Sequence, residues 1–363
     1  MTESRGLRDV DWTMLLIALL LAGIGILQIY SATQSEEGSS LWWKQLIFVG
    51  AGLLVFWVIS HFDYHSFLGQ APYLYVVFTV ILFGLMIFSR VVLGAKRWIS
   101  LGGGMKLQPS EFMKIVLVLF MARFLADLKT ESLDNVDLMK LMGIVFMPFV
   151  LVNLQPDLGT SLCYLPVLAV GLLLAGMNRQ QAVVLLLIVM LVLPVGWFVL
   201  KDYQRARLTS FLDPAQDPQG SGYQVLQSKI AVGSGGMWGA GVTRGMQIQL
   251  QFLPFAHTDF IFAAFAEEHG FIGVVTVLGL YFLLLMQILQ NAQTAPDRAG
   301  TAICMGVAGI LLFHVLENVG MVAGLMPVAG IPLPLMSYGG SNILSVFIML
   351  GLVNNVRLRR FLL

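Results

Sequence analysis

The chain has 363 residues, of which 58% are hydrophobic and only 11% are charged, and its formal net charge at pH 7 is +1. Soluble domains carry about 25% charged residues, so this composition excludes a soluble globular protein and predicts a polytopic membrane protein. The nearly neutral charge balance gives no reason to expect a nucleic-acid partner.

About ten apolar runs are long enough to cross a hydrocarbon core of ~30 Å. They predict an all-α fold in which residues 1–363 form a single transmembrane domain. The first run is long enough to stay in the membrane, unlike a short cleavable signal. The runs lie at 11–31, 43–60, 71–89, 111–127, 140–154, 158–176, 181–200, 259–290, 300–325 and 337–355.

Two connections between these runs are long, at 90–110 and at about 201–258, the second between the seventh and eighth runs. An even number of spans places both termini on one side. The Arg residues near both ends make that side cytoplasmic by the positive-inside rule. Both long connections then lie outside, although they carry nine Lys and Arg residues. Either the spans are miscounted, or these cations are kept outside because they bind an anionic ligand.

Charged residues near a membrane span are candidates for function because they are costly there. Glu111 and Lys114 lie three positions apart, on one face of a helix that starts after Pro109. They form either a structural ion pair or part of a cationic pocket that Lys96 and Arg97 extend. Such a pocket would suit a phosphate or pyrophosphate group.

Two further acids favour structural interpretations. Asp157 directly precedes the sixth run, where an Asp commonly caps the following helix. Glu317 lies late in the ninth run with His314 one turn before it, which favours helix packing through a buried hydrogen bond over chemistry.

The stretch HTDFIFAAFAEEHG, residues 257–270, carries three acids beside an apolar run. If a helix starts near Thr258, Asp259 lies at the membrane mouth and Glu267 lies about 12 Å deeper. Glu268 then faces the opposite side, so the three acids form no cluster. The spacing alone leaves Asp259 as a helix cap or a catalytic base.

The connection at 201–258 is too long to be a passive link. Its apolar side predicts a short amphipathic helix lying on the membrane surface, followed by glycines that let the chain bend. Either a mobile lid over Asp259 or a rigid cover is consistent with this pattern. The apolar side consists of Tyr223, Val225, Leu226, Ile230 and Val232.

At this point the motifs resemble a known family. HTDFIFAAFAEEHG is similar to the HTDFIF-x(4)-EE-x-G motif of the SEDS proteins (shape, elongation, division and sporulation). Other SEDS-like motifs occur in the family's order along nearly the whole chain. They are AKRWI (95–99), QPSEFMK (108–114), QPDLGTSL (155–162) and SYGGSN (337–342). Within SYGGSN, Asn342 stands where Ser is common, and no functional consequence is expected. The loop segment QSKIAVGSGG resembles the RodA branch more than the FtsW branch.

The resemblance implies a peptidoglycan glycosyltransferase that works in cell elongation and rod shape. Such an enzyme polymerises lipid II into β-1,4-linked glycan strands at the outer face of the cytoplasmic (inner) membrane and releases undecaprenyl pyrophosphate. It also implies a class B penicillin-binding protein, a transpeptidase, and the elongation machinery as partners; that protein would act by holding the predicted lid. Two alternatives remain open: a lipid II flippase, or a non-catalytic scaffold for the penicillin-binding protein.

The family's essential acid maps onto Asp259, which would take the proton from the acceptor hydroxyl as a general base. No metal-ligand spacing stands out and no cofactor is certain, although a divalent cation is left open. Eleven residues are predicted to bind substrate: Lys96, Arg97, Glu111, Lys114, Asp157, Arg207, Lys229, His257, Thr258, Ser337 and Tyr338.

Overall fold

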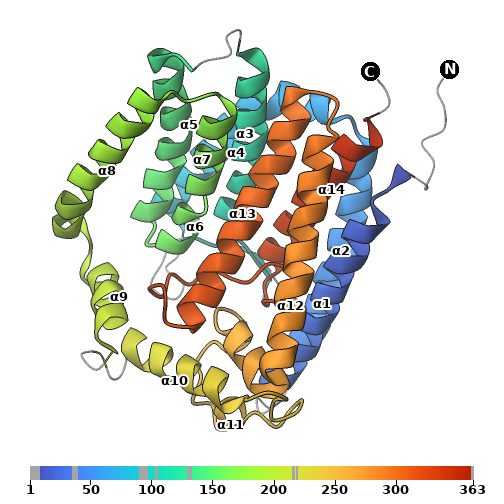
Figure 1. Ribbon diagram of the computed structural model, residues 1–363, viewed down its shortest axis with the longest axis vertical. Coiled ribbons are helices and arrows are strands. Elements are labelled where there is room, and N and C mark those ends of the chain that lie inside the picture. Colours follow the sequence, from blue (N-terminus) through green and yellow to red (C-terminus); the bar gives the residue numbers. More distant parts are fainter. Residues whose placement is uncertain are drawn as a thin grey trace.

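A computed structural model describes residues 9–34, 40–89, 97–102, 105–128, 133–214, 217 and 220–360. The described chain is a bundle of helices (Figure 1), which confirms the predicted all-α fold. Its first half forms α1 (Trp12–Ala32), α2 (Leu41–His61), α3 (Tyr64–Phe88), a hairpin of β1 (Ile99–Gly102) and β2 (Met105–Leu107), α4 (Pro109–Asp127), α5 (Asn135–Leu154), α6 (Leu158–Leu162) and α7 (Leu165–Leu174). The second half forms α8 (Arg179–Val199), α9 (Asp202–Leu212), α10 (Ser221–Ser234), α11 (Met246–Gln249), α12 (Ile261–Gln293), α13 (Arg298–Val322) and α14 (Gly340–Leu358).

The ten predicted spans all correspond to helices in the described part of the chain. Eight helices are long and apolar enough to cross a membrane, namely α1, α2, α3, α5, α8, α12, α13 and α14. The other two runs are α4, which carries four charged residues, and the interrupted pair α6–α7 over Leu158–Leu174. Most of α4 is buried inside the bundle, so its charged side chains find partners in the protein instead of meeting lipid.

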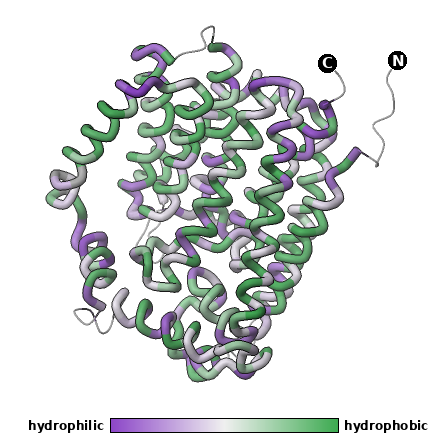
Figure 2. The backbone as a smooth tube through the Cα atoms, viewed as in Figure 1, coloured by the Kyte–Doolittle hydropathy of each residue, from purple (hydrophilic) through white to green (hydrophobic). Residues whose placement is uncertain are grey.

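The bundle is built around α13 and α14, which are 67% and 78% buried over their most apolar stretches, whereas α8 is only 6% buried. Figure 1 shows α8 at the edge of the molecule, away from the central helices. Hydrophobic residues dominate its length in Figure 2, and hydrophilic residues gather near the two ends of the bundle. Since α8 has hardly any protein around it, its apolar side chains are those of a helix that faces lipid.

The two termini lie at the same end of the bundle (Figure 1), as an even number of spans requires. A buried polar cluster joins three helices there. Asp11 caps α1, accepts a 2.7 Å hydrogen bond from Asn291 Nδ2 of α12 and pairs with Arg357 of α14 at 3.1 Å. The charge of Asp11 is therefore balanced although the side chain is fully buried.

Helix α12 is broken at Gly270, whose φ of 61° and ψ of −164° are not helical. Loop residues 236–241 fill the break. The amide of Phe271 donates to Gly236 O, and those of Ala240 and Gly241 donate to Glu267 O and Glu268 O, each at 2.9 Å. The long connection is thus anchored in α12 through backbone hydrogen bonds, and residues 261–269 form a separate short segment.

The predicted helix start near Thr258 is wrong by three residues, because α12 begins at Ile261. The reason lies in tertiary hydrogen bonds. The carbonyl oxygens of Thr258 and Asp259 accept from the side chains of Ser337 and Asn318, at 2.7 and 2.8 Å. Side chains from other elements therefore take the place of the first helical turn.

Helix α10 confirms the helix predicted within 223–232, but the single apolar side predicted for it is wrong. Val225, Ser228 and Ala231 are buried against α12 and α13, with spacings of three residues. Leu226 and Ile230 point the other way and are 51% and 42% exposed. The predicted apolar side did not include Ser228 and Ala231. These small residues nevertheless form the packed face together with Val225, because they let helices approach closely.

Candidate functional site

The centre of the candidate site is a turn at His257–Phe260, immediately before α12. The amide groups of Thr258 and Phe260 both donate to Phe255 O, at 3.0 and 3.2 Å, which closes the turn. Phe260 is buried, whereas Asp259 is partly exposed. The fold therefore holds the backbone of Asp259 fixed, while the residue as a whole keeps part of its surface exposed.

The SYGGSN segment holds this turn in place. Ser337 Oγ donates to Thr258 O, and the amide of Tyr338 donates to His257 O at 2.9 Å. Gln45 of α2 in turn braces the segment, since its Nε2 donates to Ser337 O at 3.0 Å. Ser337 is fully buried, so the structure gives it a positioning role that differs from the substrate contact expected for it.

The side chains of Arg207, on α9, and Asp259 both lie beside Gly330. Its Nη1 donates to Ala329 O at 3.1 Å, which places the guanidinium beside Gly330. A Cβ atom at Gly330 would lie 3.3 Å from Asp259 Oδ2 and 3.9 Å from Arg207 Nη1. The absence of a side chain at Gly330 therefore leaves room between an acid and a cation that come from distant parts of the sequence.

A second cation, Arg97, approaches from the segment before β1. Its Nη1 pairs with Asp157 Oδ1 at 3.1 Å, and Asp157 Oδ2 accepts from Gln108 Nε2 at 2.7 Å. Asp157 also caps α6 by accepting from the amide of Thr160, which confirms the predicted cap. Asp157 is thus a buried positioning group for Arg97 and α6.

The electrostatic surroundings of Asp259 combine opposing effects. Burial raises the pKa of its carboxyl group, the nearby Arg207 and Arg97 lower that pKa, and Asp157 raises it. The net result is a pKa above the ordinary value for an aspartate. A raised pKa makes the carboxylate a stronger base, and the charges of Arg207 and Arg97 favour its ionised form.

Glu111 and Lys114 form the predicted ion pair, 2.9 Å apart and almost completely buried. Lys114 Nζ also lies 3.1 Å from His314 Nε2, and His314 Nδ1 lies 3.0 Å from Pro332 O. His314 therefore donates through Nδ1 and accepts from Lys114 through Nε2. Lys114 has no exposed surface, so of the two predicted alternatives the described structure favours the buried ion pair over a cationic pocket.

Glu267 and Glu268 hold the long connection. Glu267 Oε1 accepts from the amide of Gln247 at 2.8 Å, at the start of α11. Glu268 accepts from Gln28 Nε2 at 3.2 Å, from the amide of Thr243 at 3.1 Å and from Ser31 Oγ. These two acids are buried and have structural partners, whereas Asp259 is the acid of this motif that keeps partial exposure.

The remaining predicted site residues divide into three groups. The ring of Tyr338 lies edge-on to that of His257, with centroids 6.0 Å apart. The stem of Lys229 packs on Gly324, just beyond α13, and outside the group around Asp259. Lys96 lies outside the described residues. Within the described residues, no three His, Cys, Asp or Glu side chains are grouped to hold a metal ion.

Several residues that shape the site were missed from the sequence. Asn318 Nδ2 donates to Asp259 O and to Ile331 O, both at 2.8 Å, and so fixes the turn to the segment that carries Gly330. Gln108 and Gln45 brace Asp157 and Ser337. In the sequence, each of these three residues is a single amide side chain in or beside an apolar run. Ordinary helix packing would explain such a residue equally well, so the sequence did not mark them as part of the site.

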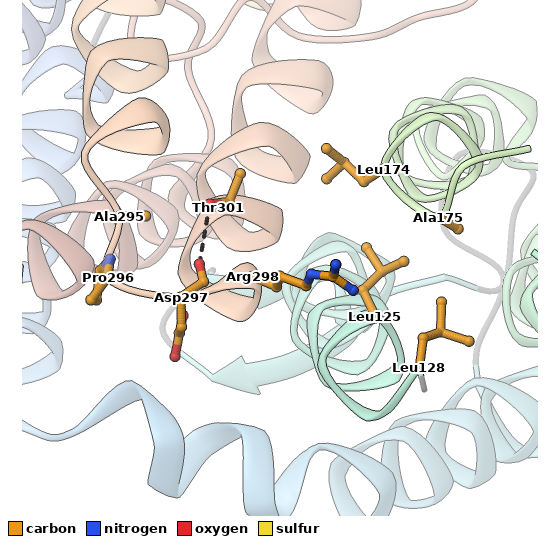
Figure 3. A pocket seen from close by; sticks show the side chains of 9 residues that line it. All are labelled: Leu125, Leu128, Leu174, Ala175, Ala295, Pro296, Asp297, Arg298 and Thr301. Carbon is orange, nitrogen blue, oxygen red and sulfur yellow. Dashed lines mark hydrogen bonds between the residues drawn. The ribbon is translucent and has the colours of Figure 1, made fainter. Parts of the chain in front are cut away.

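One cavity of the described chain lies at the end of the bundle where the two chain ends are marked (Figure 1), and Figure 3 shows the side chains that line it. Its volume is about 390 Å³, and it lies where α12 passes into α13. Asp297 in its wall is occupied as the cap of α13, since it accepts from the amide of Gly300 at 2.6 Å. This cavity therefore offers no free base and is not the candidate active site.

Comparisons with known proteins agree over almost the whole chain. The family model of the FtsW/RodA/SpoVE cell cycle proteins matches residues 11–360. The peptidoglycan glycosyltransferase MrdB of Escherichia coli K12 is 40% identical over 353 residues, which cover 97% of this chain and 94% of the relative. The peptidoglycan glycosyltransferase RodA of Treponema pallidum is 34% identical, with 98% and 99% covered.

Solved structures show the same similarity in three dimensions. A structure described as a peptidoglycan synthase complex that coordinates polymerization and crosslinking contains a chain with a TM-score of 0.83 and 31% identity. The crystal structure of the rod shape determining protein RodA of Thermus thermophilus gives a TM-score of 0.72 at 28% identity. In both cases 97% of this chain and 98% of the other chain are covered.

Proposed function

The chain belongs to the FtsW/RodA/SpoVE family, and we propose that it is a peptidoglycan glycosyltransferase that polymerises lipid II with Asp259 as the general base. Relatives named as peptidoglycan glycosyltransferases support the activity. The observation that carries the residue assignment is the geometry at Gly330. There the Asp259 carboxylate, whose pKa is raised, and the Arg207 guanidinium both border the position where Gly330 has no side chain.

The chemistry of the reaction suits these groups. Lipid II carries its sugar α-linked to pyrophosphate, and a β-1,4-linked product requires inversion, so a single displacement suffices. Asp259 takes the proton of the acceptor 4-hydroxyl while the anomeric carbon is attacked. The departing undecaprenyl pyrophosphate gains negative charge, which Arg207 and Arg97 stabilise. Arg207 borders Gly330 together with Asp259, and Arg97 is held nearby by its ion pair with Asp157.

The same proposal sets the orientation in the membrane. Both termini face the cytoplasm, and the end of the bundle formed by α10, α11 and the hairpin faces outside. The Arg residues at both termini and the shared position of the termini support this orientation. Arg207 of the long outer connection and Arg97 then serve a pyrophosphate substrate, which accounts for these two departures from the positive-inside rule.

The proposed partner is a class B penicillin-binding protein whose transpeptidase cross-links the new glycan strands during cell elongation. Support comes from the similarity to a chain of a peptidoglycan synthase complex that coordinates polymerization and crosslinking. The similarity to MrdB and to RodA proteins favours a role in elongation and rod shape over division.

The test uses the purified chain in detergent with fluorescent lipid II. We expect glycan polymer without any membrane gradient, which a flippase or a scaffold without catalysis would not produce. Asp259→Asn keeps the size of the side chain and its place in the turn, so we expect a folded protein that makes no polymer. Near-native polymerisation by this variant, at a native unfolding temperature, would contradict the general-base role.

A further inference from the structure

A second cavity lies beside the candidate site, between the end of α3 and the β1–β2 hairpin. Its volume is about 580 Å³, in the range of pockets that hold small ligands. One wall is a face of α3 formed by Ile81, Gly84, Leu85 and Phe88, which are spaced as neighbours on a helix. The opposite side carries Trp98 and Lys106. The cavity is thus apolar along α3 and cationic at its hairpin end.

Arg97 connects this cavity to the candidate site. Its guanidinium carbon lies 5.9 Å from the centroid of the Trp98 ring, which lines the cavity. The same guanidinium pairs with Asp157 and acts electrostatically on Asp259. Its Nε is buried and has no hydrogen-bond partner among the described residues. The N–H group at Arg97 Nε can therefore donate a hydrogen bond to an oxygen atom of a bound ligand.

On the basis of the proposed function, we propose that this cavity binds the donor substrate, with its polyprenyl chain against α3 and its pyrophosphate between Lys106 and Arg97. The chemistry of the cavity matches such a lipid. The apolar face of α3 takes a hydrocarbon chain, and the two cations complement a pyrophosphate. Helix α3 ends at Phe88, so this face lies at the end of a membrane span, where a lipid-linked phosphate group would sit.

The position of Arg97 identifies the donor and not the acceptor. In an inverting displacement the base and the leaving group flank a single anomeric carbon. The pyrophosphate of the acceptor is instead separated from the attacking hydroxyl by the whole disaccharide. Arg97 pairs with Asp157, which caps α6, and Gly159 of α6 packs on Ala329 O. The same carbonyl accepts from Arg207, which borders Gly330 together with Asp259, so Arg97 is placed on the side of the base where the pyrophosphate leaves. In that step the new bond forms from the acceptor oxygen to the anomeric carbon, the bond to pyrophosphate breaks, and the proton goes to Asp259.

The chain part of the site is tested by filling the cavity. A Cβ atom at Gly84 would have no heavy atom within 4 Å, so Gly84→Leu places its side chain in the cavity without moving the backbone. Gly69→Leu is the matched control, because Gly69 lies on the same helix and is equally unobstructed. Binding of undecaprenyl pyrophosphate is measured by native mass spectrometry in the Asp259→Asn background, where no turnover occurs. We expect Gly84→Leu to weaken binding about ten-fold and Gly69→Leu to leave it unchanged.

The headgroup part is tested by removing a charge at the hairpin. Lys106 is exposed, so Lys106→Met does not disturb the core and keeps the proposal testable should Gly84→Leu fail to fold. We expect Lys106→Met to weaken binding of both undecaprenyl pyrophosphate and the short farnesyl pyrophosphate. Lys44→Met, an exposed lysine of α2, is the matched control and should change neither.

The outcomes separate this inference from the proposed function. Native binding of undecaprenyl pyrophosphate by both folded Gly84→Leu and folded Lys106→Met would overturn the donor site while leaving the polymerase assignment intact. Weakened binding in both variants would support the donor site even if the native protein made no polymer, and in that case the proposed function alone would fail.

Discussion

Arg207 and Asp259 are separated by 51 residues of the long connection and its anchors, yet they meet at Gly330. Arg207 lowers the pKa of Asp259, whereas burial raises it. A general base must be ionised, so the rate falls as the pH drops through that pKa. Arg207→Met removes the lowering influence. We therefore expect the acid limb of the kcat/KM profile against pH to move to higher pH.

Arg207→Lys is the control for this shift. It retains a positive charge, so the acid limb should stay closer to that of the native protein even if the rate at the optimum falls. A profile that does not move in Arg207→Met, measured with fluorescent lipid II across the acid range, would show that the two groups are not coupled during turnover.

The pair Glu111–Lys114 makes a different prediction, about stability. Removing one partner leaves an uncompensated buried charge, which costs about 3–5 kcal/mol. Lys114→Met and Glu111→Gln alone should therefore lower the unfolding temperature in detergent strongly. The double variant removes both charges and should be more stable than either single variant. If it is not, the hydrogen bond from Lys114 to His314 holds this region more than the ion pair does.

The same double variant separates a structural pair from a substrate contact. Polymerisation by a stable double variant would make the pair purely structural, as its complete burial suggests. A stable double variant without polymer would show that the charge of Lys114 is used in catalysis.

The sequence identified individual site residues where a motif contained them. It did not show which of these residues lie close together in the fold. Asp259 stood out through its motif, and Asp157 through its position before a helix. The proximity of Arg207 to Asp259 depends on how α9 packs beside the segment at Ala329, which no local pattern encodes. The sequence left Lys114 either in an ion pair or in a cationic pocket, because it does not reveal that His314 of another helix lies against the Lys114 amine.

At the scale of elements, the break in α12 is the feature that positions the long connection. Gly239 has a φ of 81°, and a Cβ atom there would lie 2.1 Å from Glu268 O. Gly239→Ala therefore adds backbone strain of about 1–3 kcal/mol to a steric clash. We expect a lower unfolding temperature and faster proteolysis of residues 235–250.

Gly279→Ala is the matched control within the same helix. Gly279 lies in the regular part of α12, with no heavy atom within 4 Å of its Cβ position. Alanine there should be neutral or stabilising by up to about 1 kcal/mol, because it favours the helix. Equal effects at both positions would mean that the loop is not locked into the break.

The type and number of the membrane-spanning elements could be predicted from the sequence, because each apolar run is a strong local signal. The breaks within helices and the exact helix starts could not be predicted, because they arise from tertiary contacts. Gly270 lies within an apolar run that predicts one continuous helix, but it is the point where loop residues 236–241 replace helical hydrogen bonds. The start of α12 at Ile261 likewise depends on Ser337 and Asn318, which are contributed by other elements.

At the scale of the whole molecule, the contacts of the long connection are unevenly distributed. Its second half is fixed by α10, which packs on α12 and α13, and by the loop in the break at Gly270. Its first half is held weakly. Among the described residues, α8 packs little against other helices, although Gln181 near its start donates to Leu133 O and Asn135 Oδ1, and α9 packs mainly on α10. The side chains of Gln204 and Arg207 attach α9 to Asn153 and to Ala329 by single hydrogen bonds.

The uneven distribution of contacts changes which segment is expected to act as the lid. A segment with few buried contacts opens most readily, so we expect the moving part to be α8 and α9, and not α10. Arg207 lies on α9 and would move with it.

The measurement is the distance distribution between paired spin labels after replacement of the buried Cys163 and Cys304. Labels at the exposed Leu212 of α9 and Leu325 after α13 should give a broad distribution. Labels at Leu226 of α10 and Leu325 should give a narrow one. A penicillin-binding partner that acts by holding the lid should narrow the first distribution and raise the polymerisation rate. Equally narrow distributions for both pairs, with and without the partner, would leave the long connection as a rigid cover, with Arg207 permanently placed beside Asp259.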